Sequence, residues 1–97
     1  MNYKHERVSV LKLACNLGDI ILICGYLPFY DTRNLQIQKT IYQDTMSYIE
    51  NVMDDHVGSK FILLLDMNCN MYQSNHPYSL LIHDTMAKFS LVSAFDL

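Results

Sequence analysis

The clearest hydrophobic pattern is the unbroken apolar run Phe61–Leu65, which leads directly into Asp66 and then, two positions later, Asn68. The run is short and contains neither glycine nor proline, so it predicts a strand buried on both faces of a sheet. Strand side chains repeat with a period of two, so Asp66 and Asn68 would point the same way. They would stand at the carboxyl end of that strand, where α/β folds often place their chemistry. The alternative is that Asp66 caps a turn in an Asx-rich loop.

Two earlier segments also have the pattern of strands. Val8–Leu13 partly alternates between apolar and polar residues, and Ile20–Cys24 is continuously apolar. The turn residues Asn16–Asp19 make a short connection between them, which predicts an antiparallel hairpin. Pro28 is expected to end the second strand, because proline cannot donate a hydrogen bond to a neighbouring strand.

Two further segments have the pattern of helices. Apolar residues recur every three or four positions and predict one amphipathic helix: Ile37, Ile41, Tyr42, Met46, Ile49, Val52 and Met53. Asp31–Asn34 offers N-caps for it, and Gly58 suits a left-handed position after its end. A second helix is predicted from Leu80 to Phe89, with Ser79 as its N-cap. Leu91–Phe95 is predicted to begin another strand.

The predicted order is therefore β-β-α-β-α-(β), an α/β fold class of the α+β sandwich type. Strands joined by helices imply a sheet on which helices pack. The predicted helices can cover only one face, so the other face needs a second sheet or another partner. Hydrophobic residues make up 51% and charged residues 18% of the chain. This is apolar for a small domain that must cover its own surface, which again indicates packing against something more.

Charge and cysteine content narrow the class of protein. The net charge of −3 does not attract a polyanion, which lowers the expectation of nucleic-acid binding without removing it. Cys15, Cys24 and Cys69 are odd in number and lack CxxC spacing, so neither a disulfide framework nor a structural zinc site is predicted. The polar start of the chain and the absence of an apolar run of about 20 residues predict an intracellular protein, nuclear or cytoplasmic, that is neither secreted nor membrane-bound.

Three marks together resemble a known family: Gly25-Tyr26-Leu27-Pro28 after a strand, an amphipathic helix, and Leu65-Asp66-Met67-Asn68 after another strand. In this order they are similar to the middle of the endonuclease/exonuclease/phosphatase superfamily, which has the DNase I-like four-layer fold. The greatest similarity is to the endonuclease domain of LINE-type non-LTR retrotransposons. The resemblance extends from about Val8 to Leu97 and implies that residues 1–97 are a central fragment of one such domain.

The resemblance implies a metal-dependent phosphodiester hydrolase that nicks DNA with Mg²⁺ or Mn²⁺. Carried over from the family, Asp66 would polarise or deprotonate the attacking water. Asn68 would donate to a phosphate oxygen or help to place the metal, and Tyr26 would direct its hydroxyl at the phosphate or the nucleophile. The metal would neutralise charge in the transition state and activate water.

The chain also departs from the family. Leu65 replaces a family glycine, and its side chain is expected to crowd the site. The family's metal-binding glutamate and its Ser-Asp-His motif have no counterpart here, so we expect half an active site, poor metal binding and negligible nuclease activity of the isolated chain. The alternative function is an inactive remnant or a protein-interaction module of the same fold. The expected partners of the chain are the missing half of the domain or a second copy of the chain. Cys69, His76 and His83 match no standard zinc spacing.

Overall fold

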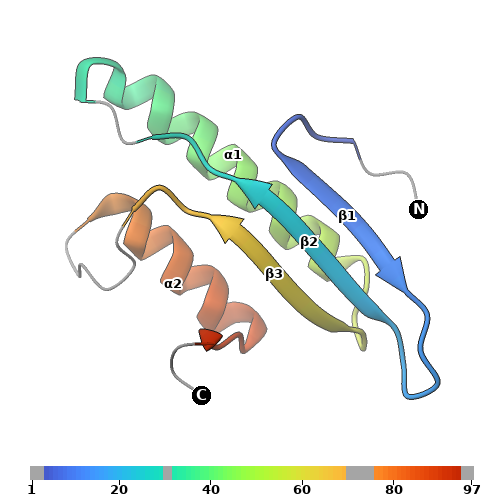
Figure 1. The fold of residues 1–97 in the computed structure, drawn as a ribbon. Coiled ribbons are helices and arrows are strands. Elements are labelled where there is room, and N and C mark those ends of the chain that lie inside the picture. Colours follow the sequence, from blue (N-terminus) through green and yellow to red (C-terminus); the bar gives the residue numbers. More distant parts are fainter. Residues whose placement is uncertain (1–3, 30–31, 70–75, 95–97) are drawn as a thin grey trace.

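The computed structural model describes residues 4–29, 32–69 and 76–94 as a mixed α/β unit (Figure 1). Its elements are, in chain order, β1 (Val8–Leu13), β2 (Ile20–Tyr26), the 3-10 helix η1 (Thr32–Asn34), α1 (Leu35–Asp54), β3 (Lys60–Asp66) and α2 (Pro77–Phe89). The strands form one sheet in the order β1-β2-β3. β1 is antiparallel to β2, which confirms the predicted hairpin, and β3 is parallel to β2.

The carboxyl end of β2 is held closely by both of its neighbours. Tyr26 N–H donates to the Arg7 carbonyl at 3.1 Å, and Leu27 N–H donates to the Asp66 carbonyl at 2.8 Å. A Cβ atom on Gly25 would lie 2.7 Å from the Arg7 carbonyl oxygen. Only glycine lets the two backbones approach this closely, so Gly25 is required by its contact with the chain before β1.

The start of α2 differs from the prediction. α2 begins at Pro77 rather than Leu80, and the His76 ring nitrogen Nδ1 accepts a hydrogen bond from Tyr78 N–H at 3.1 Å. Proline suits the first helical position because its missing N–H needs no partner there. Ser79 is therefore not the N-cap, and it is fully buried within the helix.

The predicted last strand is absent from its described part. Ser90 has a left-handed φ of 56° and ends α2, and Leu91 N–H turns back to the Met86 carbonyl at 2.8 Å. Residues 91–94 pair with no strand of the described sheet. Phe95 lies outside the described residues.

The hydrophobic core lies between one face of the sheet and the two helices. Its fully or nearly buried apolar members are Val8, Ile21, Ile23, Leu27, Tyr42, Met46, Ile49, Val52, Met53, Tyr78 and Ile82. The rings of Tyr42 on α1 and Tyr78 on α2 stack with their centroids 3.6 Å apart. The Tyr42 hydroxyl also donates to the Met67 carbonyl at 3.1 Å, which ties α1 to the chain after β3.

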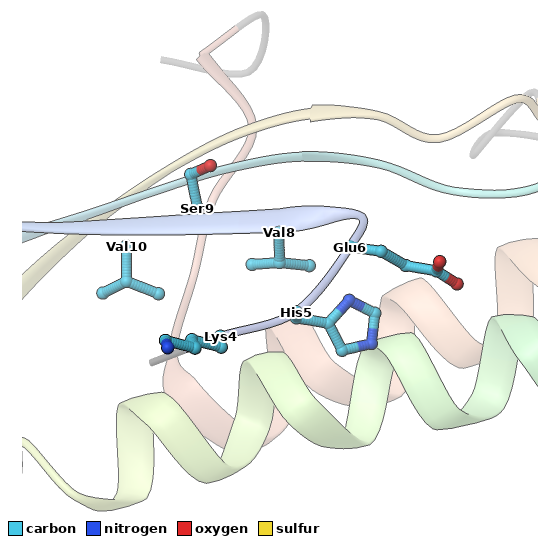
Figure 2. Close-up of a pocket in the computed structure, with 6 residues that line it drawn as sticks. All are labelled: Lys4, His5, Glu6, Val8, Ser9 and Val10. Carbon is cyan, nitrogen blue, oxygen red and sulfur yellow. The ribbon is translucent and has the colours of Figure 1, made fainter. Parts of the chain in front are cut away.

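The opposite face of the sheet is open. Ile62 is 47% and Leu64 is 59% exposed, whereas Phe61, Leu63 and Leu65 pack against the core. The prediction that this strand is buried on both faces is therefore wrong for the described chain. Both helices lie on the same side of the sheet (Figure 2), and exposed and partly buried residues alternate along β3.

Candidate functional site

Tyr26 and Asp66 are brought together by the register of the two parallel strands. They are paired residues at the carboxyl ends of β2 and β3. Both are exposed, and alternation along the strands puts them on the open face. Two of the predicted site residues are thus direct neighbours, although 40 positions separate them in the chain.

Asn68 reaches the same place by a different geometry from the predicted one. The strand ends at Asp66, and Asn68 has a left-handed φ of 50°. Its backbone N–H donates to Asp66 Oδ1 at 3.3 Å, and its side-chain amide donates to the Leu27 carbonyl. The bond to Asp66 is the Asx-turn that the sequence left open as an alternative. Asn68 therefore links the ends of β2 and β3, and one of its two amide hydrogens is already engaged.

Arg7 joins these residues without having been predicted. Its guanidinium carbon lies 5.3 Å from the centroid of the Tyr26 ring, within the range of a cation–π contact. Arg7 Nε is buried and has no hydrogen-bond partner within the described residues. The predicted hairpin contained the signal, because antiparallel pairing sets the residue before β1 beside the end of β2. We call Arg7, Tyr26, Asp66 and Asn68 the carboxyl corner.

Leu65 does not crowd the carboxyl corner. Its side chain packs against the hydrophobic core, whereas Asp66 is exposed on the open face. Successive strand residues point to opposite faces, so a large residue beside Asp66 occupies the helix side of the sheet. The expected clash is therefore wrong. The register partner of Leu65 is Gly25, which has no side chain to compete for that space.

Cys69 contacts the buried Tyr42, whereas His76 and His83 lie at the start and on the surface of α2. Burial raises the pKa of Tyr42 far above its ordinary value, with a further contribution from Cys69, whose Sγ lies 3.8 Å from the Tyr42 hydroxyl oxygen. Burial also raises the pKa of the Cys69 thiol, which disfavours the reactive thiolate. His76 caps α2, and His83 is exposed on the same helix. Among the residues with described positions, no three His, Cys, Asp or Glu side chains gather to hold a metal ion.

A shallow pocket lies beside β1 and is lined by Lys4, His5, Glu6, Val8, Ser9 and Val10 (Figure 2). Val8 and Val10 point towards the helices, and Ser9 points away from them. The His5 ring packs 4.6 Å from the Tyr48 ring, and its Nε2 lies 3.7 Å from an Asp44 oxygen. The pocket thus lies where the segment before β1 packs on α1, and it contains none of the predicted site residues.

Comparisons with known proteins add no relative to this description. No protein-family model, curated protein or solved structure matches the chain. Within the described residues, neither helix combines the length and hydrophobicity needed to cross a membrane. The contacts at the carboxyl corner are therefore the observations from which a function has to be argued.

Proposed function

We propose that this chain is the central part of a DNase I-like domain that hydrolyses phosphodiester bonds with a divalent metal, as a retrotransposon-type DNA-nicking endonuclease does. The observation that carries the proposal is the pairing of Tyr26 with Asp66 at adjacent parallel strand ends. Asn68 joins the same corner through its hydrogen bonds to Asp66 and Leu27. The resemblance of these motifs to the family supports the proposal from the sequence.

The carboxyl corner offers groups suited to a phosphodiester and a water molecule. Asp66 accepts one hydrogen bond at Oδ1 from Asn68, which orients the carboxylate and leaves Oδ2 for a water or a cation. A positioned carboxylate can take a proton from an attacking water. The Tyr26 hydroxyl and the Arg7 guanidinium are donors that can approach phosphate oxygens. The Arg7–Tyr26 contact also holds the Tyr26 ring beside Asp66.

The carboxyl corner supplies one carboxylate, that of Asp66, which is the smallest number by which proteins commonly bind Mg²⁺. Mg²⁺ prefers oxygen ligands, keeps several waters and is often bound by one or two carboxylates together with substrate phosphates. Asp66 is the carboxylate of the corner and would hold the ion, with Asn68 beside it. A bound metal would neutralise phosphate charge and lower the pKa of its water. Asp66 would orient that water and receive its proton.

The proposal is tested by locating the metal and substrate on the protein. Mn²⁺ broadens the NMR signals of nuclei near it, so titration should first broaden the signals of Tyr26, Asp66 and Asn68. A short DNA duplex added with Mg²⁺ should shift the same signals. Asp66→Asn keeps the size of the side chain and removes its charge, so it should abolish the Mn²⁺ effect.

The acidic pair Asp54 and Asp55 at the end of α1 is the internal control, since it offers carboxylates away from the corner. Mn²⁺ that broadens the signals of Asp54 and Asp55 first, or DNA that shifts signals outside the carboxyl corner, would contradict the hydrolase proposal. Either result would mean that the corner has no special affinity for the ligands of a phosphodiesterase.

A second candidate function is an inactive interaction module of the same fold. Two observations favour it: the absence of a three-residue metal cluster from the described residues, and the apolar open face. A plasmid-nicking assay separates the candidates. Mg²⁺-dependent nicking that Asp66→Ala removes would identify a working hydrolase and would overturn the inactive module.

A further inference from the structure

The open face consists of rows of register partners across the strands. Leu11, Leu22 and Ile62 form one central row, and Ser9, Cys24 and Leu64 form the next. These rows lie on either side of the middle row Val10, Ile23 and Leu63, whose side chains face the helices. The open face therefore has an apolar centre, with Leu11 at 54% and Leu64 at 59% exposure.

The two ends of β3 carry opposite charges on the open face. Lys60 begins β3 and Asp66 ends it, and both are exposed. They belong to the same alternating set as Ile62 and Leu64, so all four side chains are on the open face. Within one chain the six-residue separation puts Lys60 and Asp66 about 20 Å apart, too far for an ion pair. Lys60 and Asp66 therefore cannot pair with each other in a single copy, and Arg7, whose guanidinium lies over the Tyr26 ring, is a second charged group at the Asp66 end.

These positions are self-complementary. A two-fold axis can be placed halfway between two facing sheets so that it runs across the strands, parallel to the middle row. The rotation reverses strand direction and keeps each strand over its own copy, so Ile62 meets the partner's Leu64. It also sets Lys60 over the partner's Asp66, and Asp66 over the partner's Lys60. Sheets packed face to face lie about 10 Å apart with strands near −30°, which long side chains can bridge.

We propose that the open face binds a second copy of this chain, forming a two-fold sheet-on-sheet dimer with an apolar centre and two Lys60–Asp66 ion pairs at its ends. An isologous interface requires a patch that complements itself, and the charge order along β3 meets that requirement. The dimer goes beyond the proposed hydrolase and is tested without any nuclease measurement. It also engages Asp66, so a second copy and a metal would compete for the carboxyl corner.

The apolar centre is tested with one leucine on the face and one away from it. Leu64→Lys leaves an unpaired ammonium inside the interface, so it should raise the dimer dissociation constant about a hundredfold in sedimentation equilibrium. Leu80→Lys on α2 is the matched control, because Leu80 is exposed to a similar degree (53%) outside the face. It should leave the dissociation constant unchanged. Far-UV circular dichroism of each variant establishes that it is folded.

The charged ends are tested by reversal. Lys60→Glu sets like charges against each other at both ends and should weaken the dimer about tenfold. The double variant Lys60→Glu with Asp66→Lys restores opposite charges and should recover most of the affinity. Lys39→Glu on the exposed side of α1 makes the same charge change elsewhere and should have no effect.

Cross-linking gives a direct readout of the geometry. A carbodiimide activates a carboxylate and joins it to an amine as an amide, taking up the water that is lost. A Lys60–Asp66 cross-link is expected in dimeric species only, since the two residues are about 20 Å apart within one chain. A wild-type chain that stays monomeric at high concentration would overturn the proposal. So would a dimer that Leu64→Lys leaves intact, a double variant without recovery, or larger open-ended assemblies in place of a dimer.

Discussion

At the scale of single residues, Asn68 makes two hydrogen bonds that hold the carboxyl corner together. Its positive φ of 50° is a conformation that asparagine tolerates better than most residues. That turn lets its amide reach the Leu27 carbonyl while its backbone N–H meets Asp66. One residue thus closes the gap between β2 and β3 and orients the carboxylate next to Tyr26.

Two substitutions at Asn68 separate its backbone and side-chain contributions to stability. Asn68→Gly loses the bond to Leu27 but tolerates the positive φ, so we expect about 1 kcal/mol of destabilisation. Asn68→Ala loses the bond and strains the backbone, so we expect about 2 kcal/mol. Urea unfolding measures both values. Equal losses would show that backbone conformation contributes nothing here.

At the scale of elements, α1 and α2 are joined by a small polar cluster as well as by their aromatic stack. Glu50 on α1 accepts hydrogen bonds from the Thr85 hydroxyl and from Lys88 Nζ, both at 2.7 Å. Burial by itself would raise the pKa of Glu50, but the hydrogen bonds from Lys88 and Thr85 outweigh it and hold the pKa below its ordinary value. The charged form of Glu50 therefore stabilises the folded state.

The lowered pKa of Glu50 predicts a pH-dependent stability. The stabilisation of the folded state by ionised Glu50 is fully present above the pKa of Glu50 in the unfolded chain, about 4.3. It is lost as the pH falls through the lower pKa of Glu50 in the folded state. Glu50→Gln should cost about 1 kcal/mol at neutral pH, measured by urea unfolding. The wild-type and Glu50→Gln curves should then converge below about pH 4. Curves that stay parallel through this range would show that Glu50 ionisation has no part in joining the helices.

At the scale of the whole molecule, the described chain is a sheet with both helices on one face (Figure 1). Its other face exposes apolar residues. A large exposed apolar patch on a small protein marks an interaction surface. The proposed dimer and a second sheet of a larger domain would cover the same residues. Both follow from the same physical need to remove Leu11, Ile62 and Leu64 from water.

Thermal unfolding offers a whole-molecule prediction of the dimer. Association stabilises the folded state by mass action, so the wild-type Tm should rise by several degrees over a roughly hundredfold increase in protein concentration. The Tm of Leu64→Lys should be independent of concentration, as for a monomer. The Tm of the control Leu80→Lys should rise with concentration as in the wild type. A wild-type Tm that ignores concentration would contradict the proposal.

The structure differs from the sequence pattern at the start of α2 and at Arg7. Serine is a common cap, so the sequence favours a helix start near Leu80, but Pro77 and His76 begin the helix three residues earlier. Arg7 has no motif around it, and it is part of the corner only through the register of the hairpin. Local preferences compete at helix ends, whereas pairing across strands has no short-range signal.

The sequence by itself determined the three strands and two α-helices that the structure describes, apart from their ends, and set Asp66 at the end of a strand. It could do so because alternation, helical periodicity and turn residues act over a few neighbours. It also predicted a last strand from Leu91 that the described residues do not form. Only the tertiary structure decided that Tyr26 lies beside Asp66, since strand register depends on distant pairing. It also decided which face of β3 is open. An apolar run such as Phe61–Leu65 looks the same whether its second face is covered or still awaits a partner.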